Sequence, residues 1–211
     1  MAIDDLLDEH EQSERARTWL RNNAFGLVGG VALGLAAIFG WQWWQGQQVR
    51  GQYEASDRYA VVQEQVRTGK LKEAQEGAKA LAGSAYEVAA ALTISKAQLD
   101  SGKRDDAIAT LRAVKDTDAL LGPVVTQRLA RLLIDAGKAS EALPIIGEAD
   151  EPVVQEIRGD ALFALGRLDE ARKAYENALV NLQVGTPQRL VVELKLTQAG
   201  GTPPQTPDSA T

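Results

Sequence analysis

Four glycines, each followed by a basic residue, are the pattern in this chain that comes nearest to a phosphate site. They are Gly69-Lys70, Gly102-Lys103, Gly137-Lys138 and Gly166-Arg167. A P-loop needs a second glycine five residues before its Gly-Lys pair and a serine or threonine directly after it, because these groups cradle the phosphates and bind Mg²⁺. None of the four pairs has either feature. We therefore interpret them as turns.

The inventory of reactive side chains also argues against catalysis. The chain has 211 residues, no cysteine and a single histidine, His10. This excludes a thiolate nucleophile, a metal site built on several Cys or His residues, and a catalytic triad. The net charge is −6, and no run of five basic residues suggests binding to nucleic acid. We expect a binding protein that is not an enzyme and uses no cofactor, metal or nucleic acid.

The four glycines are in phase with a helical repeat. They begin the stretches GKLKEA, GKRDDA, GKASEA and GRLDEA, and their spacing is close to the ~34 residues of a tetratricopeptide repeat, which has two antiparallel helices. Each glycine is expected to end a first helix at positive φ. An alanine five residues later should lie where the second helix crosses the first. The first repeat fits least well, because Val62 and Leu81 occupy positions that usually hold small residues.

These patterns predict an all-α protein with a tetratricopeptide-like solenoid of about four repeats and a C-terminal capping segment. The low aromatic content of 5% suits closely packed helices. Thr186-Pro187 is typical of a helix start, and residues 189–196 are expected to form the cap that a solenoid needs at its open end. The Val-Val pair in this stretch also permits a strand. Residues 200–211, rich in Pro, Gly, Ser and Thr, are predicted to be disordered.

Residues 24–41 predict a membrane span, because these 18 residues contain no charged side chain. A bilayer core is ~30 Å thick and requires roughly 20 apolar residues in a helix. Trp19 precedes the span, and Trp43 and Trp44 follow it, as expected for indoles in the headgroup region. A buried core helix and a cleaved signal peptide are the alternatives. The first fourteen residues carry six acids and no Lys or Arg, which favours an uncleaved signal anchor.

The basic residues beside the span predict its orientation. Arg15, Arg17 and Arg21 lie just before it, whereas Arg50 and Arg58 lie farther away on the other side. The positive-inside rule then places the N-terminus in the cytoplasm and the repeats on the far side of the membrane, which in a bacterium is the periplasm. We expect the anchor helix to continue into the first repeat helix. The predicted domains are a cytoplasmic tail (1–23), a transmembrane signal anchor (24–44), the repeat domain (45–199) and the disordered tail (200–211).

Gly26, Gly30 and Gly34 are spaced four residues apart within the span. This spacing places them on one helical face, where another helix can approach closely. They are the candidate membrane helix-packing face. The alternative is that glycine is simply common in membrane helices.

A candidate client groove follows from the repeat phase, because the first helices of such repeats line the concave side of the superhelix. Counting back three, six and ten residues from each turn glycine gives an apolar row, a polar row and a mixed row on roughly one helix face. The candidate client groove consists of Tyr59, Gln63, Lys96, Leu99, Gln127, Arg131, Ile134, Asp160 and Phe163. This mixture suits loose contact with varied unfolded segments. The alternative is that the apolar row is core between neighbouring helices.

With these features, the chain resembles the ancillary SecYEG translocon subunits (YfgM-like proteins) over nearly its whole length. The resemblance rests on the short polar N-terminal tail, the anchor ending in GWQWW, the stretches QRLARLL and IRGDALFALGRLDEARKAYENAL, and a C-terminal segment like ELKL. The Pro-rich tail is not part of the family pattern. The resemblance implies a single-pass inner-membrane protein that associates with the SecYEG translocon and with periplasmic chaperones or a prolyl isomerase. It also implies that exported client polypeptides are bound.

A second hypothesis remains open from the residues alone. The same anchor and repeats would serve a membrane-anchored adaptor for another envelope machine, such as cell division or outer-membrane assembly.

Overall fold

The computed structural model describes residues 2–114 and 121–204, with side chains from residue 13 onward. Regular structure in this part of the chain is helical, and it contains no strand. The helices are α1 (Ala2–Arg67), α2 (Leu71–Lys79), α3 (Glu87–Asp100), α4 (Arg104–Arg112), α5 (Gly122–Asp135), α6 (Ala139–Ile146), α7 (Pro152–Ala164), α8 (Leu168–Val180) and α9 (Pro187–Gln198). The Val-Val pair therefore lies in a helix, and the all-α prediction is confirmed.

The chain divides into two compact units, Met1–Glu54 and Ala55–Thr211. The first unit consists of α1 residues and contains the apolar span. The helical segment Ser13–Arg67 is long and apolar enough to cross a membrane: its most apolar window of 18 residues has a mean hydropathy of 1.9, and none of that window is buried. This exposure argues against the alternative of a buried core helix. Helix α1 also extends beyond Glu54 to Arg67, as expected for an anchor that continues into the first repeat helix.

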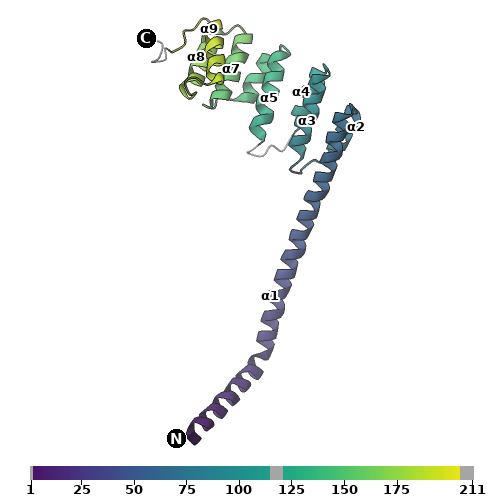
Figure 1. Ribbon diagram of the computed structural model, residues 1–211, viewed down its shortest axis with the longest axis vertical. Helices are drawn as coiled ribbons and strands as arrows, with labels where there is room; N and C mark the ends of the chain where they lie inside the picture. Colours follow the sequence, from purple (N-terminus) through teal and green to yellow (C-terminus); the bar gives the residue numbers. More distant parts are fainter. Residues whose placement is uncertain (1, 115–120, 205–211) are drawn as a thin grey trace. The chain divides into compact units, whose positions relative to one another are not determined.

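The second unit is a succession of helix pairs. Helices α3 and α4, α5 and α6, and α7 and α8 pack against each other, and each second helix also contacts the first helix of the next pair (Figure 1). The four predicted turn glycines all have positive φ, between 73° and 76°. The Gly166 N–H donates to Phe163 O and the Arg167 N–H to Leu162 O, both at 2.9 Å. These two bonds satisfy carbonyls at the helix end, and each of the other three turns repeats the arrangement.

The crossing alanines are fully buried, as the repeat pattern predicts. Ala74, Ala107, Ala142 and Ala171 each have 0% exposure. They belong to three hydrophobic clusters, built around the end of α1 with α2 and α3, around α3–α7, and around α7–α9. The core therefore follows the repeats along the unit.

Exchanges of side-chain size explain the poor match of the first repeat to the expected pattern. Val62 replaces the small residue of its first helix, and Gly77 faces it from α2, where an added Cβ would lie 3.2 Å from Val62 Cγ2. The fourth repeat has the reverse arrangement, because Gly159 makes room for the ring of Tyr175. A Cβ at Gly159 would lie 2.4 Å from Tyr175 Cε1. Each of these two helix crossings thus pairs a glycine with a larger side chain.

Helix α9 has the structure of a first helix in a fifth repeat. Thr186 caps its start by accepting a hydrogen bond from Arg189 N, and Pro187 occupies the first turn. At its end, Gly200 has φ of 84°, and its N–H and that of Gly201 donate to Thr197 O and Leu196 O. This is the turn found after each earlier first helix. Of the tail predicted to be disordered, residues 205–211 lie outside the described part.

Candidate binding surfaces

The apolar row of the candidate client groove is partly core and partly surface. Ile134 and Phe163 are half-buried and pack against the two larger hydrophobic clusters, and Val66 packs in the same way against the smallest. Leu99 differs, since 39% of it is exposed. Among the described members of this row, Leu99 is therefore the side chain best placed to contact a ligand.

Three polar residues of the candidate client groove are exposed, and the two charged ones differ in whether they are paired. Gln63, Lys96 and Arg131 are exposed. Lys96 pairs with Asp100 one turn away, whereas Arg131 has no ion pair or hydrogen bond to the residues that the structure describes. Arg131 is thus a cation available to a ligand at the middle of the unit.

Tyr59 and Gln127 occupy more enclosed positions. The Tyr59 ring stacks on that of Tyr86 with centroids 5.3 Å apart, and its hydroxyl lies 3.2 Å from Thr93 Oγ1. Gln127 is half-buried and lines a small hollow with Pro123 and Val154. Tyr59 therefore contributes mainly to packing between α1 and α3.

At the α7 end of the candidate client groove, two acidic residues bond to a lysine from α9. Lys195 Nζ lies 2.7 Å from both Glu156 Oε1 and Asp160 Oδ2, and the Tyr175 hydroxyl donates to Asp160 Oδ1 at 2.9 Å. Burial of the ring and the adjacent Asp160 carboxylate raise the pKa of the Tyr175 hydroxyl. Burial opposes the charge of Lys195, but hydrogen bonds to Asp160 and Glu156 outweigh it and raise the pKa of the amine. Both carboxylates therefore share one cation from within the chain, Lys195.

Sequence reasoning missed the contribution of α9 to this face. Gly200 follows Gly166 by one full repeat of ~34 residues, and this spacing was the available signal. Counting back ten and six residues from Gly200 adds Leu190 and Leu194 to the mixed and polar rows. Both are exposed.

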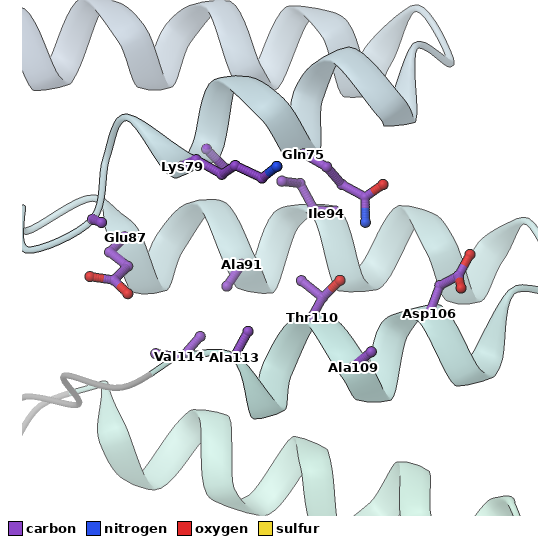
Figure 2. Close-up of a pocket in the computed structure, with 12 residues that line it drawn as sticks. Gln75, Lys79, Glu87, Ala91, Ile94, Asp106, Ala109, Thr110, Ala113 and Val114 are labelled. Carbon is purple, nitrogen blue, oxygen red and sulfur yellow. The ribbon is translucent and has the colours of Figure 1, made fainter.

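A second hollow lies in the first repeats and is lined by α2, α3 and α4. Figure 2 shows Gln75 and Lys79 of α2 on one wall, Thr110 and Ala113 of α4 on the other, and Ile94 of α3 between them. Its volume is about 470 Å³. The lining is rich in alanine, and these small side chains leave the space open. Charged groups are confined to Lys79, Glu87 and Asp106.

The candidate packing face of the anchor is unobstructed by the described residues of its own unit. A Cβ placed on Gly26, Gly30 or Gly34 would meet no atom within 4 Å, apart from neighbouring residues of the helix itself. The face therefore has no partner among the described residues of its own unit.

Within the described part of the chain, no group of three His, Cys, Asp or Glu residues is arranged to hold a metal ion.

Comparison with known proteins gives one sequence family and one fold. Residues 17–201 match the family model described as a tetratricopeptide repeat-like domain. The chain is 30% identical over 177 residues to the ancillary SecYEG translocon subunit of Escherichia coli (strain K12), covering 80% of this chain and 86% of that protein. It is 24% identical to the Haemophilus influenzae protein of the same name, covering 82% and 89%.

The fold has counterparts among solved structures. The tetratricopeptide-like repeats of a kinesin light chain from Podosopora anserina superpose with a TM-score of 0.51 at 16% identity, over 70% of this chain and 86% of that one. At this level of identity the likeness shows the repeat fold alone.

Proposed function

Because the chain belongs to the tetratricopeptide repeat-like family of ancillary SecYEG translocon subunits, we propose that it is a non-enzymatic scaffold at the translocon that binds newly exported polypeptides and periplasmic folding factors. The observation that carries the client part of this proposal is the accessible first-helix face. Leu99 offers an aliphatic contact on that face, and Arg131 offers a charge that is unpaired among the residues the structure describes. This surface requires no cofactor, since binding alone performs the function.

We place the chain in the inner membrane as a single-pass protein with a periplasmic repeat unit. The apolar part of α1 supplies the span, and Arg15, Arg17 and Arg21 before it favour a cytoplasmic N-terminus. Carbonate extraction should leave the protein in the membrane. Protease added to spheroplasts should digest the repeats, and their protection would reverse this topology.

The first prediction concerns the anchor. Gly30→Leu combined with Gly34→Leu should reduce co-purification of the chain with SecYEG in mild detergent, because leucine fills the surface that a facing helix would contact. The matched control is Val28→Leu combined with Val31→Leu, which keeps the span apolar and the glycines intact.

Crosslinking from the glycine face in the wild-type chain separates the two partner hypotheses. Crosslinks from the glycine face to a SecY helix support the translocon, whereas crosslinks to a cell-division or outer-membrane assembly protein support the other envelope machine. Equal recovery of SecYEG with both double variants would contradict a packing role for these glycines.

The second prediction concerns clients. The full chain in lipid nanodiscs should bind a fluorescent, reduced and unfolded protein without nucleotide or metal, as measured by anisotropy. Leu99→Ser should weaken this binding roughly threefold, because part of one buried aliphatic side chain is lost. Its melting temperature should fall less than that of a core variant, since 39% of Leu99 is exposed.

Phe163→Ser provides the contrasting variant, because Phe163 packs against the core and its loss should lower the melting temperature. The absence of any binding by the wild-type chain would contradict the client role.

A further inference from the structure

Helix α9 presents three aliphatic side chains on the surface of the repeat unit. Leu190, Val191 and Leu194 are 56%, 46% and 71% exposed, and we call them the α9 triplet. Their spacing places them side by side on one helical face. In α7, the residues that correspond to Leu190 and Leu194 are Glu156 and Asp160, which bond to Lys195 of the next first helix. No further first helix follows α9 in the residues described up to 204, and the three side chains of this face are exposed.

Helix α9 itself offers no unpaired charge beside the α9 triplet, because its charged residues bond to other groups of the described chain. Arg189 pairs with Glu193 at 2.8 Å and donates to Leu179 O and Leu182 O. Lys195 bonds to α7. The other exposed residues of α9 are Pro187, Gln188, Thr197 and Gln198. A charged ligand would therefore find no unpaired partner on α9. An aliphatic ligand could bind without removing water from a charged group of this helix.

The size of the α9 triplet limits what it can bind. Stable protein interfaces involve roughly 20–30 residues on each side, so three side chains cannot alone hold a second copy of the chain. A few aliphatic residues of an extended polypeptide segment match the area of the α9 triplet and would bind to it weakly. Weak binding suits a surface that must release its ligand.

We propose that the α9 triplet is a docking site for short, uncharged aliphatic segments of unfolded polypeptides. This inference rests on the proposed client function and specifies which chemistry part of the client surface recognises. The site continues the first-helix face beyond the fourth repeat, since Leu190 and Leu194 occupy its fifth set of positions.

The test uses the full chain in lipid nanodiscs and two unstructured peptides in a Gly/Ser background, one with a central Leu-Val-Leu and one with a central Ser-Ser-Ser. Empty nanodiscs measure binding to lipid. The wild-type chain should bind the Leu-Val-Leu peptide and not the other. The double variant Leu190→Ser with Leu194→Ser should raise the Kd for the Leu-Val-Leu peptide roughly tenfold, as expected when two partly exposed leucines are removed from a contact.

Two further variants keep the test decisive. Val180→Ser combined with Val184→Ser removes two exposed valines of 79% and 61% exposure outside α9 and should leave the Kd unchanged. Leu194→Lys places a charge at the most exposed position of the triplet and should likewise raise the Kd for the Leu-Val-Leu peptide. Melting curves should be alike for all variants, because none of these side chains is buried.

The possible results separate the inference from the proposed function. If the wild-type chain binds an unfolded protein but both double variants bind the Leu-Val-Leu peptide alike, the α9 triplet is not the site, although the client function stands. If the wild-type chain binds neither peptide nor unfolded protein, the client function itself fails. If the serine variant turns a dimer into a monomer in sedimentation equilibrium, the triplet is a contact between copies and the inference is wrong.

Discussion

Gly159→Ala should lower the free energy of unfolding of the repeat unit by about 1–3 kcal/mol, the usual cost of overpacking a core. The added methyl group would lie 2.4 Å from Tyr175 Cε1 and 2.6 Å from Cδ1, so the aromatic ring or the helix must move. The sign is informative, since glycine to alanine inside an unobstructed helix instead stabilises by roughly 0.5–1 kcal/mol.

Urea unfolding of the full chain, followed by far-UV circular dichroism, measures this change. The control is a double-mutant cycle with Tyr175→Leu, which removes the ring. In that background Gly159→Ala should cost little or should stabilise, because the steric conflict is gone. A stabilising effect of Gly159→Ala in the wild-type background would show that α7 and α8 do not cross at this pair.

Lys195→Met should destabilise the repeat unit by about 2–3 kcal/mol, because it leaves two partly buried carboxylates without their cation. The side chains of Glu156 and Asp160 are only 9% and 22% exposed, so water replaces the lost amine poorly. The effect should appear in the same urea experiment as a lower midpoint.

The chain offers a matched control in Lys96→Met. Lys96 and Asp100 form a pair within one helix whose side chains are 68% and 61% exposed, and its loss should cost no more than ~0.5 kcal/mol. Adding Glu156→Gln and Asp160→Asn to Lys195→Met should recover part of the lost stability, because the uncompensated charges are removed. Equal midpoints for Lys195→Met and Lys96→Met would contradict a structural role for the Lys195 cluster.

The same cluster gives the repeat unit a dependence on alkaline pH. Burial and Asp160 raise the pKa of Tyr175, and the two carboxylates outweigh burial to raise that of Lys195. The folded state therefore retains protons that the unfolded chain releases above about pH 10. Their stabilisation is complete below that pH and is lost as pH rises further. Urea midpoints should fall between about pH 9 and pH 11 in the wild-type chain, and fall less in Lys195→Met combined with Tyr175→Phe.

Local patterns in the sequence were sufficient to predict the long apolar N-terminal helix, the helical repeats and the C-terminal helix. An uncharged apolar run of residues specifies a span through its length. A turn glycine and a crossing alanine recur because each repeat meets the same two geometric demands, positive φ at the turn and close contact of backbones. These demands act within a few residues or between adjacent helices, and they leave a regular signature.

The tertiary structure alone decided which members of the candidate groove are accessible. Periodicity assigned Asp160 and Leu99 to the same face, but it could not show that Lys195, 35 residues away, neutralises Asp160 while Leu99 stays exposed. Such pairing depends on the register between α7 and α9, which no local pattern carries. Gly159 and Tyr175 illustrate the same limit, because their sizes are matched across a helix crossing and either residue alone appears ordinary. The sequence determined the positions that recur, and packing between the helices determined what each position does.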